Sequence, residues 1–437
     1  MNIKFLNVEN LFYLSLLSLP LFFLTGPFLT DLFICLIGIF FIITALKKNI
    51  LRNYIYNRFT FIFLIFYVII LSSSLISEFI FLSLESSLFY FRFLFFSLGT
   101  FYILNKFKNC LYYFSVIFLC IYIFIILDGF IQYYMGYDLF GFEMPSPNRL
   151  SGPFNDELIL GGVVSRFYPL ATLCIIYLNT KINFNFLMLF ILFTLAVLSI
   201  VVHSGERTAL FLLLISIIIM IFTIRKISFQ SSLIILFSIC LILLTMFILN
   251  SDIRKRIIDT TYNQMYPFDQ EANSGIACAN TPEMCKRSLI MFSVNHHGHY
   301  LTGIKMFFDK PIVGHGPKTF REKCKFDKFK TSSGCSTHPH NMYIQLASET
   351  GFIGLIIPIC LFIIVTFNLF KLFIFKFLNR DLFLSDFKIC LLISFFITLF
   401  PLAPSGNIFN NYVSFIYYLP LGFFLYFNFI ENNMNKS

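Results

Sequence analysis

About twelve long apolar stretches divide this chain, and they restrict what it can fold into. Roughly 20 apolar residues are enough to cross about 30 Å of bilayer hydrocarbon as a helix. Helices also satisfy their own backbone hydrogen bonds, which lipid cannot do. We therefore expect an all-α, polytopic transmembrane helical bundle of about twelve spans, lying near 9–27, 30–46, 59–77, 86–105, 111–134, 157–178, 184–202, 208–224, 231–250, 345–370, 385–404 and 411–430.

The composition excludes a soluble protein. Of 437 residues, 58% are hydrophobic, 12% are charged and 63 are phenylalanine, which is more apolar surface than a soluble core can bury. The first stretch has no small-x-small cleavage site and leads directly into another span, so we do not expect a cleaved signal peptide. No internal repeat is visible, and we expect residues 1–437 to form a single integral membrane domain.

The positions of lysine and arginine predict the orientation. Basic residues are retained on the cytoplasmic side in short loops, and here they fall in alternate turns if both termini are cytoplasmic. The formal charge of +10 then mostly reflects basic residues that fix the orientation in the membrane, and we expect no nucleic-acid binding. The outer side receives one large aqueous loop, 251–344, in which 299–308 has the pattern of a short amphipathic helix that ends before Pro311.

Four cysteines lie in that outer loop, where an oxidising compartment favours disulfides. Three pairings are open, and we favour Cys278–Cys285 and Cys324–Cys335 because both links are local in sequence. Free thiols are the alternative. A zinc site is less favoured because the loop has no Cys-x-x-Cys spacing.

The segment Ser336-Thr337-His338-Pro339-His340-Asn341 precedes an apolar stretch that contains Gly351 and Gly354. Histidine transfers protons near neutral pH, and a histidine at a membrane boundary is costly unless it is paired or used. The segment therefore favours a general base. The alternative is structural: Asn341 caps the helix and His340 is hydrogen-bonded. His338 is either a supporting or an incidental residue.

Arg207 opens a span at the outer boundary, after Ser204-Gly205-Glu206. A guanidinium group at a helix start is suited to binding phosphate oxygens. The alternative for Arg207 is that its side chain only extends to the membrane interface. The alternative for Glu206 is that it is simply an interfacial charge. Because no paired-carboxylate motif is present, we expect neither a metal site nor a cofactor.

The spacing of His340-Asn341, nine residues and then Gly351-x-x-Gly354 resembles the signature of the O-antigen ligase family. Two further segments are similar to that family, namely Ser204 to Ala209 and the Pro-x-x-Gly-x-Gly turn 311–316. Arg149 to Gly161 resembles another segment found in many members. The resemblance implies a GT-C-like membrane fold and a metal-independent, inverting glycosyltransferase on the periplasmic face of the bacterial inner membrane.

The resemblance further implies that His340 and Arg207 are catalytic and that Asn341 orients the base or a sugar. The glycan would pass from undecaprenyl diphosphate in the membrane lipid to a sugar of the lipid A core. An O-antigen polymerase, whose acceptor is another carrier-linked repeat unit, is the alternative enzyme. A polysaccharide or lipid transporter is the alternative from a different class, although the chain lacks the internal symmetry that transporters often show.

The chain departs from the family at one position. Members usually carry a second arginine about fifteen residues before the turn at Pro311, where this chain has His296. We expect His296, His299 or Arg287 to replace it. Lys318 and Arg321 are further candidates for binding the same anion. The alternative for Lys318 and Arg321 is that they are only solvated loop residues. Arg149 is a candidate substrate-binding residue, but a structural ion pair between Arg149 and Glu157 is slightly favoured.

Overall fold

The computed structural model describes residues 8–146, 149–265 and 293–434, which form helices joined by loops. Strand-like pairing within these ranges is limited to isolated bridges between Tyr137 and Glu143 and between Ser146 and Arg149. The long helices are α1 (Val8–Leu24), α2 (Pro27–Lys47), α4 (Arg58–Leu75), α6 (Arg92–Lys106), α7 (Cys110–Met135), α8 (Leu160–Ile182), α9 (Phe186–His203), α10 (Arg207–Thr223), α11 (Phe229–Leu249), α17 (Met342–Phe377), α18 (Asp386–Thr398) and α19 (Asn411–Met434). The short helices are α3 (Leu51–Ile55), α5 (Ile80–Ser87), η1 (Gly152–Phe154), α12 (Ser251–Arg254), η2 (Lys255–Asp259), α13 (Thr260–Met265), α15 (Val294–Asp309) and α16 (Phe320–Lys323).

Each predicted span coincides with one of the long helices. In the described ranges, nine helical segments are long and apolar enough to cross a membrane, and one of them, Ile80–Lys106, joins α5 to α6. Helices α1 and α10 are apolar but shorter, and α18 has 13 residues. The protein is therefore an all-α polytopic membrane protein, and twelve crossings stays a prediction.

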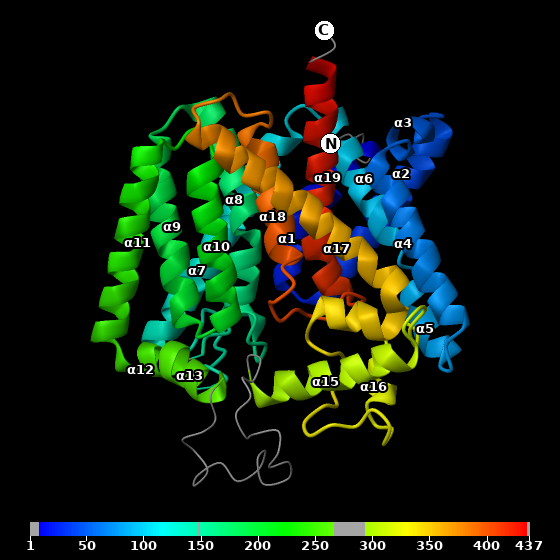
Figure 1. The fold of residues 1–437 in the computed structure, drawn as a ribbon. Helices are drawn as coiled ribbons and strands as arrows, with labels where there is room; N and C mark the ends of the chain where they lie inside the picture. Colours follow the sequence, from blue (N-terminus) through cyan, green and yellow to red (C-terminus); the bar gives the residue numbers. More distant parts are fainter. Residues whose placement is uncertain (1–7, 147–148, 266–292, 435–437) are drawn as a thin grey trace.

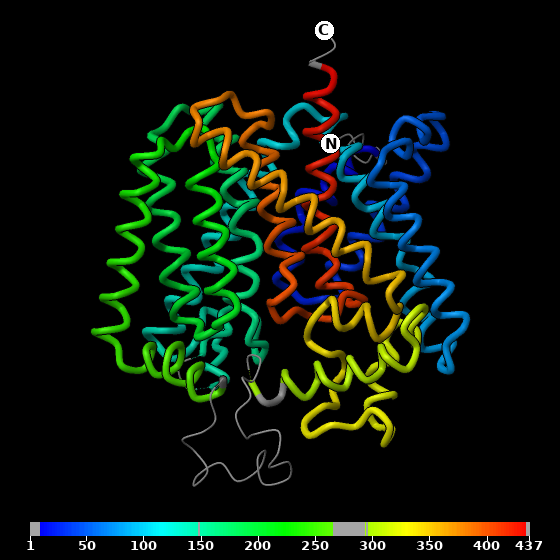
Figure 2. Tube along the Cα trace, viewed as in Figure 1, coloured from blue at the N-terminus to red at the C-terminus, as the bar shows by residue number. Residues whose placement is uncertain are grey.

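The helices form two lateral groups that are joined through the centre (Figure 1). In one group, α8 packs against α7, α9 and α10; in the other, α6 packs against α2. The C-terminal helices connect them, because α19 packs against α6 and α18 packs against α8. Figure 2 shows the same arrangement, with the last part of the chain, in red and orange, between the green and blue ends.

Aromatic side chains fill the central contacts. Phe23 of α1 stacks on Tyr412 of α19 with ring centroids 4.4 Å apart, and it also meets Phe167 of α8 edge-on at 5.3 Å. Offset and edge-on pairs of this kind add to the stabilisation from packing. The high phenylalanine content thus serves contacts between helices as well as contacts with lipid.

A glycine allows α17 to bend sharply near its start. Gly351 has φ 67° and ψ −166°, and a Cβ atom there would lie 2.3 Å from the Ile312 carbonyl oxygen. Gly314 packs equally closely against the Glu349 backbone, and the Gly316 N–H donates to the Glu349 carbonyl at 2.8 Å. The two glycine motifs are therefore one structural unit, because only glycine permits this close approach of backbones.

The short helices α12, α13, α15 and α16 lie along one end of the bundle, at the bottom of Figure 1. Helix α15 is longer than the predicted 299–308 segment at its N-terminus, where Ser293 Oγ accepts a hydrogen bond from the His296 N–H at 3.3 Å. This N-cap adds a turn that the apolar pattern does not reveal. The extra turn brings two further histidines, His296 and His297, into the helix.

Candidate active site

Four histidines meet at the start of α17. His338 and His340 lie on the loop that precedes α17, and His296 and His299 lie in the first turns of α15. The His340 ring centroid is 4.2 Å from that of His338, 5.2 Å from that of His299 and 5.6 Å from that of His296. Residues three apart share a helix face, so α15 presents both of its histidines to His340.

Hydrogen bonds from a distant loop fix His340 and His338. The His340 backbone has φ 54°, in the left-handed region that few non-glycine residues adopt, and its carbonyl accepts from the Ser405 N–H at 2.9 Å. The ring atom Nε2 of His340 lies 3.1 Å from Ser336 Oγ. His338 donates through Nε2 to the Ser405 carbonyl at 3.3 Å. Strained backbones of this kind persist where the surroundings determine them, often at active sites.

Burial keeps these imidazoles neutral. Desolvation, together with the charges of His338, His299 and His296, lowers the pKa of His340 to about 3. Desolvation lowers the pKa of His338 to about 4, although its hydrogen bond to Ser405 opposes the shift. Because an ordinary histidine titrates near pH 6.5, His340 is an unprotonated imidazole at neutral pH. This is the form that can accept a proton.

Asn341 caps α17. Its Oδ1 accepts hydrogen bonds from the Tyr343 N–H at 2.9 Å and the Ile344 N–H at 3.1 Å, and its Nδ2 donates to the Pro401 carbonyl at 2.8 Å. Asn341 therefore fixes the start of α17 directly after His340 and ties it to the loop that follows α18. Helix α17 begins at Met342 because of this cap.

Three guanidinium groups gather where α9 meets α10. Arg207 is the first residue of α10 and donates to Thr261 Oγ1 at 3.1 Å and to Gln264 Oε1 at 2.7 Å, both on α13. Arg256 of η2 donates through Nε to the Gly205 carbonyl at 3.3 Å. The charges of Arg149 and Arg256 both act on Arg207. Burial, and then the charge of Arg256, lowers the pKa of Arg149, whose buried Nε has no hydrogen-bond partner.

A buried carboxylate lies beside these arginines. Glu206 accepts hydrogen bonds from the backbone N–H groups of Gly161, at 2.6 Å, and Gly162, at 3.0 Å, so it caps the positive end of α8. Burial raises the pKa of Glu206 to about 7, although the Gly161 bond and the charges of Arg166 and Arg149 oppose the shift. One carboxylate that also serves a helix terminus cannot neutralise three guanidinium groups, so the cluster can bind an anion.

The histidine and arginine clusters are neighbours. The charge of Arg207 contributes to lowering the pKa of His296, after burial and the charge of His299. A single bound molecule can thus reach a neutral imidazole and an anion-binding arginine set. Among the residues that the structure describes, no group of three or more His, Cys, Asp or Glu side chains has the arrangement of a metal site. Proton transfer beside a bound anion is the chemistry that the arrangement supports.

The sequence of this region is similar to a known family. Residues 190–359 match the family model described as O-antigen ligase. The likeness covers this segment of the chain, which holds most of the candidate site. The match supports an O-antigen ligase or polymerase type of function in a bacterial membrane, with a lipid-linked glycan and an acceptor as its partners. No curated protein matches the chain.

The segment that matches the O-antigen ligase model runs from α9 into α17. It contains Arg207, Arg256, all four clustered histidines and the glycine unit, whereas Arg149 lies outside it. The expectation of a structural ion pair between Arg149 and Glu157 is wrong: among the described residues Arg149 makes no salt bridge, and the charge of Glu206 acts on it instead.

Two of the predicted cations line a different pocket. Lys318 and Arg321 border a polar pocket with Asn407, Asn410 and Asn411, and Arg207 does not line it. The structure therefore does not bring Lys318 and Arg321 together with Arg207. It places His296 and His299 beside His340 instead. The predicted Arg287 and the Cys278–Cys285 pair lie outside the described residues.

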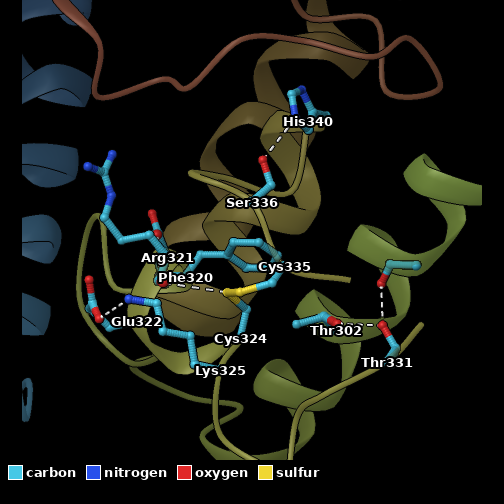
Figure 3. The surroundings of a disulfide bond; sticks show 12 residues. Thr302, Phe320, Arg321, Glu322, Cys324, Lys325, Thr331, Cys335, Ser336 and His340 are labelled. Carbon is cyan, nitrogen blue, oxygen red and sulfur yellow. Dashed lines mark hydrogen bonds and ion pairs between the residues drawn. A yellow bond between two sulfur atoms is a disulfide. The ribbon is translucent and has the colours of Figure 1, made fainter. Parts of the chain in front are cut away.

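The structure joins Cys324 to Cys335 by a disulfide, with Cα atoms 5.1 Å apart. Figure 3 shows this bond at the base of the segment that carries Ser336 and His340. Thr331, within the closed loop, is hydrogen-bonded to Thr302 of α15 at 2.7 Å. The disulfide loop thus holds the His340 segment against the helix that supplies His296 and His299.

Arg256 was missed by the sequence motifs. A signal for it was present, because Arg254, Lys255 and Arg256 follow the α11 span on the side expected to be outside. Basic residues are depleted there unless they have another purpose. Glu206 was also underestimated as an interfacial charge, since its partners Gly161 and Gly162 lie more than forty residues away in sequence.

Proposed function

We propose that this protein transfers a glycan from undecaprenyl diphosphate to a sugar of the lipid A core, with inversion at the anomeric carbon. The observation that carries the proposal is the neutral His340 next to an arginine cluster that lacks enough carboxylate to balance it. Residues 1–437 act as one membrane domain, with α13 and α15 beside the site. The site faces the periplasm, and both termini face the cytoplasm.

The arginine cluster holds the diphosphate leaving group. Arg207, Arg256 and Arg149 supply guanidinium groups that pair with phosphate oxygens. Negative charge grows on the diphosphate as the anomeric carbon–oxygen bond breaks and its electron pair moves to the phosphate oxygen. Fixed cations in a partly buried site stabilise that charge without reorganising. They supply the neutralisation that a divalent metal would otherwise give.

His340 acts as the general base. Nε2 of His340 lies 3.1 Å from Ser336 Oγ, and the proposal assigns the ring proton to Nε2, so that the Nδ1 lone pair takes the proton of the acceptor hydroxyl. That oxygen attacks the anomeric carbon from the face opposite the diphosphate, so the new glycosidic bond has inverted configuration. Ser336 is a positioning residue for the tautomer, and Asn341 holds the backbone that carries the base.

An apolar groove next to the site suits the isoprenoid chain. The groove has a volume of about 410 Å³, lies between α15 and α17, and is lined by Phe307, Tyr343, Phe362 and other apolar residues. The Phe400 ring contacts both Phe362 and Phe211, at 6.0 Å and 5.4 Å, and so connects the groove to α10. An isoprenoid in the groove would keep its diphosphate close to the start of α10.

A reconstituted reaction tests the proposal. Purified protein is mixed with an undecaprenyl diphosphate-linked glycan and lipid A core in detergent and EDTA. We expect glycan on lipid A core and the release of one undecaprenyl diphosphate for each transfer. If the glycan is joined only to another carrier-linked repeat unit, the protein is a polymerase and the proposed acceptor is wrong. If no carrier is released with either acceptor, glycosyl transfer itself is contradicted.

A further inference from the structure

A polar pocket is lined by residues that belong to neither the histidine cluster nor the arginine cluster. Its volume is about 240 Å³, and Pro27, Lys318, Arg321, Asn407, Phe409, Asn410 and Asn411 line it. Drug-sized ligands occupy pockets of about 300–1,000 Å³. The pocket is therefore suited to a smaller polar group, such as one sugar residue.

Arg321 brings an unpaired charge to this pocket. Among the described residues, its guanidinium makes no salt bridge or hydrogen bond, and its Nε is buried without a partner. A buried and unsatisfied charged donor is unfavourable, so such a group usually has a ligand. Lys318 adds a second cation. Within the described ranges its only ion pair is a 4.0 Å contact with the exposed Glu85, and exposed ion pairs contribute little free energy.

The asparagines form a fixed wall. Asn411 is held by Asp31 and Arg92, accepting from Arg92 at 2.5 Å and donating to Asp31 at 3.0 Å. Asn407 accepts from Gln345 Nε2 at 2.8 Å, and Asn410 accepts from the Tyr412 N–H at 2.9 Å. The side-chain nitrogens of Asn407 and Asn410 donate to no described residue, which leaves them available to acceptor oxygens.

We propose that this pocket binds an acidic group, a carboxylate or a phosphate, on a sugar of the acceptor glycan. Two cations and two free amide donors complement oxygen atoms that carry negative charge. The proposal rests on the proposed function, because it assigns the pocket to the acceptor of that reaction. It gives the acceptor a site distinct from the diphosphate site of the donor.

The loop that follows α18 connects the pocket to the base. Ser405, which is hydrogen-bonded to both His338 and His340, stands two residues before Asn407. Arg321 also contributes to lowering the pKa of His338, so its charge reaches the histidine cluster. An acceptor glycan anchored in the pocket by its acid therefore extends toward His340, where its hydroxyl is deprotonated.

Binding of small sugars to the purified, detergent-solubilised protein tests this pocket. Saturation-transfer NMR is measured with glucuronic acid, glucose 6-phosphate and glucose as probes. We expect both acids to bind about tenfold or more tightly than glucose, the factor expected for a charge-assisted contact. Equal binding of glucose would overturn acid recognition. Displacement of the acids by phosphatidylglycerol would show a lipid headgroup site and overturn the acceptor assignment.

A single-atom change gives a sharper test. Asn410→Asp keeps the cap at the start of α19, because aspartate also caps helices, but it places a negative charge in the pocket. We expect it to weaken binding of both acids about tenfold or more. The matched control is Asn185→Asp, an exposed cap of α9 at the opposite end of the bundle, which should bind like wild type.

Two more variants locate the acid. Arg321→Gln should lose acid binding, whereas Arg207→Ala should retain it, because Arg207 belongs to the donor site. The reverse pattern would place the acid at the diphosphate site and overturn the proposal, as would unchanged binding in Asn410→Asp. These measurements use neither the donor nor catalytic turnover. The pocket proposal can therefore be contradicted while glycan transfer is observed, and glycan transfer can be contradicted while the pocket binds acids.

Discussion

Arg256 is the residue whose role depends most on tertiary structure. It lies on η2, and its hydrogen bond to Gly205 brings its charge beside Arg207. We predict that Arg256→Ala slows glycan transfer about tenfold or more and raises the KM for the carrier, because one diphosphate contact is lost. Arg254→Ala is the matched control: this arginine is two residues away and exposed, and the change should leave steady-state kinetics unaltered. Equal effects of the two variants would mean that Arg256 acts only through the overall surface charge and makes no specific contact with the diphosphate.

Arg207 tests whether geometry matters as well as charge. A lysine keeps the charge but cannot make the two-pronged contact of a guanidinium group. We predict weak transfer by Arg207→Lys and almost none by Arg207→Ala, measured at equal membrane abundance. Normal transfer by Arg207→Ala would mean that the residue only anchors α10 at the interface.

The individual motif residues could be predicted better than their partners. His340 and Arg207 were proposed from side-chain chemistry and from the resemblance to the O-antigen ligase family, since both lie at the ends of apolar stretches, and their catalytic roles stay predictions. The positions of His296 and His299 beside His340 depend on how α15 packs against α17, which no local pattern encodes. For the same reason, Lys318 and Arg321 were grouped with the diphosphate site although they line a separate pocket.

At the scale of elements, the disulfide loop holds the catalytic segment. Removing the Cys324–Cys335 bond frees a segment with a sequence separation of 11, and such a bond typically contributes about 2–4 kcal/mol. We predict that Cys335→Ser lowers the transfer rate and increases proteolysis between α16 and α17. The control Cys240→Ser replaces an exposed free cysteine of α11 and should change neither. Wild-type transfer by Cys335→Ser would show that the loop needs no disulfide.

Span positions were predictable because hydropathy alone determines them, but helix ends were not. The predicted 345–370 span begins earlier, at Met342, because Asn341 caps it. The predicted 385–404 span ends at Thr398, since the following loop passes Pro401 and Pro404 and returns to His340. The predicted 86–105 span begins in α5, which ends at Ser87, and continues as α6 from Arg92. Ser83 of α5 donates to the Pro317 carbonyl, a contact more than two hundred residues away in sequence.

For the whole molecule, the buried histidines predict a loss of stability in acid. The pKa values of His338 and His340 are lowered to about 4 and about 3, whereas unfolded histidines titrate near 6.5. The unfolded chain therefore binds these protons first, so stability is full above about pH 6.5 and falls as the pH drops toward 4. We expect the thermal unfolding temperature in detergent to decrease over this range, with a smaller decrease for His338→Gln. A decrease of the same size in wild type and in His338→Gln would contradict a buried, neutral His338.

The rate of a single turnover by His340→Ala, measured beside wild type in EDTA, tests the central claim most directly. We predict that wild type transfers glycan in EDTA and that the variant is slower by about 100-fold or more, because a general base is worth at least that much. His340→Asn controls for folding, since asparagine accepts the positive φ at this position, and it should be equally slow. Transfer by the alanine variant above about a tenth of the wild-type rate would contradict His340 as the base.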